Sequence, residues 1–186
     1  GVGRQHQQSC TARGKRPWPD QGRWLAWQER TPTEADVRRW WAELPNANVG
    51  VAMGPTSGLV GIDVEGAGGE ARLAEMSGGD LPDTLEFATG DGRRLLYAIP
   101  GGVELRSTHE AAGQGHQEVR FQARGAQTVM PPSRHKSGRR YTWRPGHAPG
   151  EVEAAPAPAW LVELMRAERR GPTGPRLSAR ISSTSQ

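Results

Sequence analysis

Apolar and polar residues alternate along several short stretches of the chain, a pattern typical of β-strands. The clearest stretch is LVGIDVE at 59–65, which lies between two glycines, Gly58 and Gly66. The same criterion predicts strands at 48–53, 83–90, 93–100, 117–124, 126–132 and 140–144. Turn residues divide four of these strands into two predicted pairs, one around 90–92 and one around Gly125. Residues 101–115 lack the alternation and are predicted to form a polar loop.

Helical periodicity appears in three places. Thr33 is a predicted N-cap that is followed by acidic residues in the first turn, and the helix ends at Leu44-Pro45. Its apolar residues fall on one helical face: Val37, Trp40, Trp41 and Leu44. A short helix is predicted over 70–76 and an amphipathic one over 158–169. Strands in the middle with helices around them predict an α+β fold with a mainly antiparallel or mixed sheet and flanking helices.

Length and composition limit the classes to consider. The 186 residues suit one domain with tails, which we place at 17–170, between a poorly ordered segment at 1–16 and a tail or linker at 171–186. The net charge of +4, carried mostly by arginine, fits an anionic partner. A single cysteine excludes an internal disulfide and a multi-cysteine zinc site. Neither a membrane span nor a signal-peptide core is apparent, so we expect a cytoplasmic protein without a membrane partner.

Two acidic residues share one face of the 59–65 strand. Because side chains alternate along a strand, Val60, Ile62 and Val64 point into a core, whereas Asp63 and Glu65 point the other way. Both carboxylates are within reach of one cation, although solvated turn acids produce the same pattern. Glu118 lies on the polar face of a later predicted strand and is a candidate third acid.

Two further stretches leave alternatives open. Residues 16–32 carry three tryptophans among turn formers, and they form either an aromatic plug over the core or a surface on which bases stack. Residues 131–140, PPSRHKSGRR, follow the strand at 126–132. Their Ser, His, Lys and Arg side chains form either a solvated basic hairpin or a phosphate-binding set.

Three segments in order resemble a known family: PNANVGVAMGPTSGLVGIDVEG, ATGDGRRLLYAIP and EVRFQARGAQTVMPPSRHKSGRRYTW. They are similar to the N-terminal domain of bifunctional DNA primase/polymerases, of the archaeo-eukaryotic primase superfamily found in phages, plasmids and integrated elements. The resemblance covers about residues 15–165 and implies an RRM-like catalytic core. It implies template-directed nucleotidyl transfer in replication, as a primase, a polymerase or both.

The resemblance also implies roles for particular residues. Asp63, Glu65 and Glu118 would hold two Mg²⁺ or Mn²⁺ ions in catalysis. The implied partners are a DNA template or primer and an NTP or dNTP, with a helicase domain or protein as a further one. The candidate nucleotide-binding residues are Ser133, Arg134, His135 and Lys136, and the candidate DNA-binding residues are Arg93, Arg94, Arg139 and Arg140.

One position departs from the family pattern. Relatives usually carry a nucleotide-contacting histidine in G-x-G-G-R-H-L-Y, where this chain has GDGRRLLY and therefore Leu95. By analogy, Leu95 and Tyr97 are assigned to the active-site face and Arg94 to the opposite face. The departure keeps open a second hypothesis, a catalytically weakened module that binds nucleic acid or nucleotide within a replication protein. A metal-dependent nuclease is the third, because carboxylates of this kind also activate water.

Overall fold

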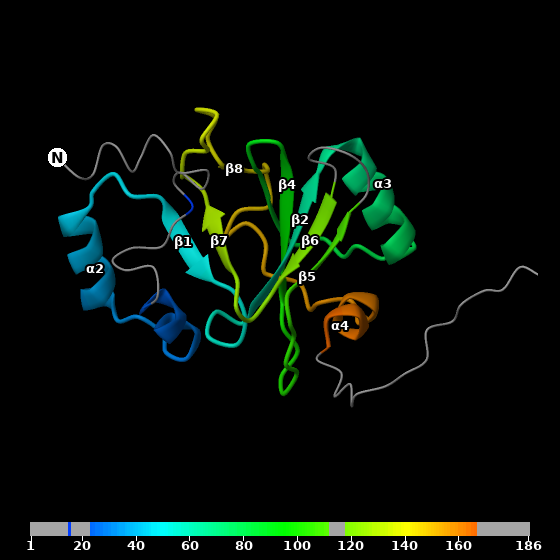
Figure 1. The fold of residues 1–186 in the computed structure, drawn as a ribbon, viewed down its shortest axis with the longest axis horizontal. Coiled ribbons are helices and arrows are strands. Elements are labelled where there is room, and N and C mark those ends of the chain that lie inside the picture. Colours follow the sequence, from blue (N-terminus) through cyan, green and yellow to red (C-terminus); the bar gives the residue numbers. More distant parts are fainter. Residues whose placement is uncertain (1–14, 16–22, 112–117, 167–186) are drawn as a thin grey trace, which may run out of the picture.

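The computed structural model describes residues 15, 23–111 and 118–166 (Figure 1). The predicted terminal segments at 1–16 and 171–186 therefore lie almost entirely outside the described residues, apart from Lys15. Within the described part, the chain folds as α+β, as predicted, with antiparallel pairing throughout both sheets.

A six-stranded sheet forms the centre of the molecule. Its strand order is β5-β6-β2-β4-β3-β8. The strands are β2 (Leu59–Glu65), β3 (Leu85–Ala88), β4 (Gly92–Ala98), β5 (Thr108–Ala111), β6 (Glu118–Gln122) and β8 (Thr142–Trp143). A separate two-stranded sheet pairs β1 (Val49–Ala52) with β7 (Gln127–Met130). Figure 1 shows this ribbon on one side of the main sheet.

The helices divide between the two sides of the molecule. On one side, α3 (Gly66–Ser77) and α4 (Ala159–Met165) pack on the main sheet. On the other side, a short 3₁₀-helix η1 (Arg23–Gln28) and α2 (Glu34–Glu43) lie beyond the β1–β7 ribbon (Figure 1). The predicted capping of α2 is confirmed, because the Thr33 hydroxyl accepts a bond from the Asp36 amide and Asp36 accepts one from the Thr33 amide.

Both faces of the main sheet are packed, but by different partners. On the face that carries α3 and α4, which we call the far face, valine and isoleucine side chains of β2 pack with Leu73 of α3 and Leu161 of α4. On the opposite face, which we call the near face, Phe87 and Leu96 pack with Met53 and with Val129 of the ribbon. Gly61 leaves room for this second layer, since a Cβ there would lie 3.2 Å from the Met53 methyl carbon.

Two parts of the strand prediction are wrong. The predicted loop at 101–115 contains β5, which pairs with β6; residues 112–115 lie outside the described residues. The predicted pair around Gly125 does not form, because β6 joins the main sheet and β7 joins β1. Gly125 has φ 88° and lies where the chain passes from one sheet to the other. The hairpin at 90–92 is confirmed, with β3 pairing β4.

Candidate active site

The three predicted acids lie on one face of two neighbouring strands. Glu65 of β2 is directly opposite Glu118 of β6 in the register, and Asp63 lies two residues before Glu65 on the same face of β2. The adjacency that sequence alone left open is therefore present. Asp63 and Glu65 are buried and Glu118 is half-buried.

Close packing behind β6 sets the position of Glu118. Helix α3 begins directly after Glu65, and its Gly69 lies against the Glu118 backbone. A Cβ at Gly69 would come within 2.7 Å of the Glu118 carbonyl oxygen, closer than real side chains approach. The GAGGE sequence that starts α3 thus allows the helix to pack close to the strand that carries the third acid.

Two arginines pair with these acids. Arg94 of β4 is opposite Asp63 in the register and forms a buried ion pair with it. Arg120 of β6 pairs with Glu118 and lies 3.9 Å from Glu65 Oε1. The acidic cluster is thus partly neutralised by its own strands. Over the described ranges, no three His, Cys, Asp or Glu side chains are grouped so that they could hold a metal ion as they stand.

The environment of the acids nevertheless favours a cation. Burial, followed by the negative charge of Asp63, raises the pKa of Glu65. Asp63 Oδ1 is buried and accepts no hydrogen bond from the residues that the structure describes. A buried carboxylate oxygen without a donor is costly, and a hard cation would remove that cost.

The comparison with protein families agrees with this geometry. The family model described as "Bifunctional DNA primase/polymerase, N-terminal" matches residues 8–160. The chain belongs to this family. Among curated proteins, no significant match was found.

The structure corrects the assignment of Leu95 in this primase/polymerase domain. Leu95 is 4% exposed and belongs to the far-face core, together with Ile62, its register partner. Arg94, the neighbour of Leu95 on β4, lies on the near face with the acids, although the sequence led us to place it on the opposite side. Alternation separates the two faces of a strand but does not say which face carries the site, and the analogy chose wrongly.

The 131–140 segment is a hairpin whose side chains alternate between two environments. Ser133 and His135 are buried, whereas Arg134 and Lys136 are exposed. The Ser133 hydroxyl accepts a hydrogen bond from the Val49 amide at 2.8 Å and so joins the hairpin to β1. His135 points towards the acids, because together with Asp63 and Glu65 it lines a small cavity of about 10 Å³.

Gly90 makes room for His135. A Cβ at Gly90 would lie 2.0 Å from His135 Nδ1, so any other residue there would displace the ring. Burial, and then the positive charge of Lys15, lower the pKa of His135. The ring is therefore neutral near pH 7, able to donate one hydrogen bond and accept another.

The remaining candidate arginines are spread over different surfaces. Arg93 points away from the acids and pairs with Glu70 of α3 at 2.7 Å. Arg139 is exposed and lies 4.0 Å from Asp91, at the rim of the small cavity. Arg140 is exposed and donates a long bond of 3.4 Å to the Pro132 carbonyl. Of the four candidate DNA-binding arginines, Arg94 is the one that contacts an acid of the cluster.

Sequence reasoning missed the two ion pairs within the site. Arg120 was visible as a near-face residue two positions after Glu118, and that spacing was the available signal. Asp63 and Arg94 are thirty-one positions apart, and only the β2–β4 register brings them together.

Within the described residues, no helix is both long and apolar enough to cross a membrane.

Proposed function

We propose that this domain is a metal-dependent nucleotidyltransferase that synthesises or extends DNA on a template, and that it serves replication. The observation that carries the proposal is the placement of Asp63, Glu65 and Glu118 on one face of β2 and β6, in a chain of the primase/polymerase family.

The donor set suits Mg²⁺ or Mn²⁺, since all three side chains offer carboxylate oxygens. When bound, such ions activate an attacking hydroxyl and stabilise the charge on a leaving pyrophosphate. The protein's own part is to hold the carboxylates in register through the β2–β6 pairing.

Two basic groups beside the acids have complementary tasks in this proposal. Arg120 is half-buried and pairs with Glu118, so it can exchange that carboxylate for a triphosphate oxygen when a cation takes the acid. His135 stays neutral and buried at the cavity, where it offers a hydrogen bond to the nucleotide. Either an NTP or a dNTP satisfies these contacts.

A second candidate is the catalytically weakened module, which binds nucleic acid or nucleotide without turnover. The ion pairs of Arg94 and Arg120 favour it, because guanidinium groups that stay paired with Asp63 and Glu118 would keep metal ions away from these carboxylates. Leu95 no longer supports it, since this residue belongs to the core.

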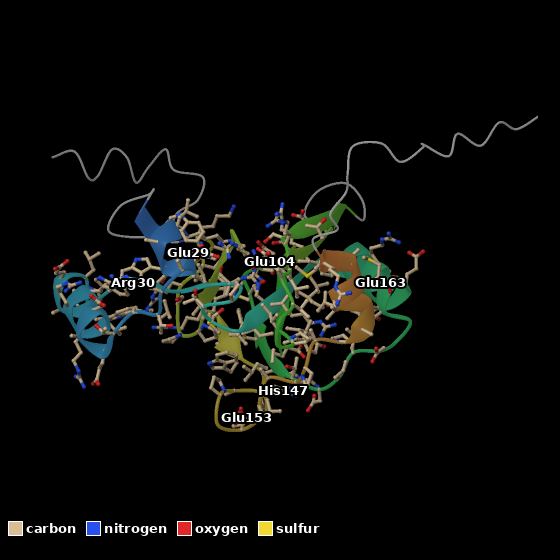
Figure 2. All side chains as sticks on the ribbon, turned by 90° about the horizontal axis from the view of Figure 1, so that it is seen from below. Glu29, Arg30, Glu104, His147, Glu153 and Glu163 are labelled. Carbon is tan, nitrogen blue, oxygen red and sulfur yellow. The ribbon has the colours of Figure 1, made fainter. Side chains whose placement is uncertain are left out.

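Primer extension separates these candidates. The purified protein is incubated with a labelled primer on a longer template, dNTPs or NTPs, and Mn²⁺ or Mg²⁺. We expect extension that chelation abolishes and that Glu118→Gln reduces at least about a hundredfold, because the metal ions contribute several kcal/mol. Glu163→Gln is the control, since Glu163 is exposed on α4 (Figure 2), a helix that packs on the opposite face of the sheet from the acids.

Glu118 is a better target than Asp63 for this test. Truncating Asp63 would leave Arg94 buried without its partner, which typically costs about 3–5 kcal/mol of stability. Glu118 lies at the strand end, and its loss leaves Arg120 beside Glu65. No extension by the wild type would overturn the transferase and favour the weakened module, whereas shortening of the labelled strand would indicate the nuclease.

A further inference from the structure

A groove of about 850 Å³ lies between the helices η1 and α2 and the β1–β7 ribbon. Its floor includes Val49, Val51 and Val129 of the ribbon. Its opposite wall carries Val37 and Leu44, which belong to the apolar face predicted for α2. No residue of α2 is buried, so the described part of the chain covers this apolar face only in part.

Four tryptophans dominate the lining of the groove. They are Trp24 and Trp27 of η1 and Trp40 and Trp41 of α2. All four are half-buried, and Trp27 and Trp40 meet edge to face with ring centroids 4.8 Å apart. Neither Trp24 nor Trp27 belongs to the two core clusters, so these two do not form the aromatic plug considered for residues 16–32; the third tryptophan, Trp18, lies outside the described residues.

The charge at the rim favours an anionic occupant. The charged side chains that line the groove are Lys15, Arg134 and Lys136, and no acidic side chain of the described residues lines it. Arg30 lies over the Trp27 ring, 4.2 Å from its centroid, and adds a further cation beside the indoles. A cationic peptide would therefore find no partner here.

The groove is continuous with the candidate active site. Lys15 and His135 line both the groove and the small cavity that contains Asp63 and Glu65. The alternation of the 131–140 hairpin explains the connection, because the buried His135 lines both spaces while the exposed Arg134 and Lys136 line the groove alone. A long ligand lying in the groove would have one end at the acids.

We propose that this groove binds an unpaired polynucleotide strand, with bases stacked on the tryptophans and phosphates on Lys15, Arg134 and Lys136. Indole rings stack on any base, and a row of cations follows a phosphate backbone, so the binding needs no particular sequence. A duplex would not fit in the same way, because its bases are already stacked on one another. The inference rests on the proposed function in that the strand would be the template presented to the acids.

Fluorescence anisotropy with a labelled 20-nucleotide deoxythymidine strand tests the proposal. The full chain is used without nucleotide and with a chelator, so the readout does not depend on catalysis. Trp24→Ala and Trp41→Ala should each weaken binding about tenfold. Leu25→Ala is the control for η1, because Leu25 is 51% exposed and does not line the groove.

A second strand separates stacking from phosphate contacts. A 20-unit abasic strand keeps the phosphates but lacks the bases. The wild type should bind it much more weakly than the deoxythymidine strand, and for Trp41→Ala the ratio of the two affinities should be about tenfold smaller than for the wild type. Equal affinity of the wild type for both strands would overturn the stacking part of the proposal.

The rim cations have their own test. Lys136→Ala should reduce the slope of log affinity against log salt by about 0.7, the value for one phosphate contact on a single strand. Arg38→Ala is the control, since Arg38 is exposed on α2, pairs with Glu34 and does not line the groove. Equal slopes for all three proteins would overturn the proposal.

The outcomes also separate this inference from the proposed function. Glu118→Gln should bind the strand as the wild type does while failing to extend a primer. If the tryptophan variants change thermal stability but not affinity, the groove is filled by the chain itself and the proposal is wrong. If they extend primers normally and bind normally, the template lies elsewhere and only this inference fails.

Discussion

The two faces of the six-stranded sheet are built from the same strands but are completed differently. The far face is closed by apolar side chains of α3 and α4. The near face is apolar only where the β1–β7 ribbon covers it, and at the other end it carries acids that are neutralised by arginines. One face is therefore complete through apolar packing, and part of the other is completed by ion pairs.

The strand β4 displays this difference within neighbouring residues. Arg94 is buried against Asp63 on the near face, while Leu95 and Tyr97 are buried in the far-face core. A polar group is thus tolerated at one position and excluded at the next. Four predictions test this contrast; the first three run from the largest expected effect to the smallest, and the fourth tests the central claim.

Leu95→His should break the far face. The imidazole would replace an aliphatic side chain that is 4% exposed, and we expect a loss of about 2–5 kcal/mol in the free energy of unfolding without any gain in nucleotide affinity. Chemical denaturation measures it. Leu164→His is the control on α4, where the leucine is 37% exposed. Tighter nucleotide binding by Leu95→His would return this position to the active-site face.

Gly90→Ala should disturb the near face. The added methyl group would overlap the His135 ring, so either the ring leaves the cavity or the turn at 89–92 moves, at a cost of about 1–3 kcal/mol. Denaturation and nucleotide KM would both report the change. Gly101→Ala should be neutral or slightly stabilising, because a Cβ there meets nothing within 4 Å. A variant at Gly90 that behaves like Gly101→Ala would show that His135 is not held by this contact.

These two positions also illustrate how far sequence reasoning extends. The alternation in 59–65 gave the right strand and the right face for Asp63 and Glu65, because one face must be apolar to pack. In β4 each face carries one arginine and one leucine, so the pattern of RRLLYA contained no information on which side the site lies. The choice of face depended on matching the family's histidine to position 95. A match shifted by one residue would place that histidine at position 94, which is Arg94 and lies on the other face.

Pairings between distant segments were the other limit. The hairpin at 90–92 is local and was predicted, whereas β1–β7 and β2–β6 join segments far apart in the sequence. Sequence reasoning therefore assigned β7 to the wrong partner and did not foresee the groove that the ribbon forms with α2. The apolar stripe of α2 was visible, but what it faces depends on tertiary structure.

Arg120→Ala should increase the affinity of the near-face acids for a divalent cation. Removing the guanidinium takes away the positive charge that pairs with Glu118 and lies near Glu65, so Mn²⁺ should bind about fivefold more tightly when no nucleotide is present. Arg124→Ala is a matched control, because both arginine side chains are 40% exposed and Arg124 pairs instead with Glu29. Unchanged affinity in both variants would mean that Arg120 does not compete with the cation.

The central claim is that Asp63, Glu65 and Glu118 together hold a divalent cation, and a titration with Mn²⁺ followed by electron paramagnetic resonance tests it most directly. The fourth prediction is that Glu65→Gln and Glu118→Gln each weaken the tightest Mn²⁺ site of the wild type at least about tenfold, while both variants stay folded. Asp83→Asn, whose side chain is 76% exposed, should bind as the wild type does. Equal Mn²⁺ binding by all four proteins would contradict the account.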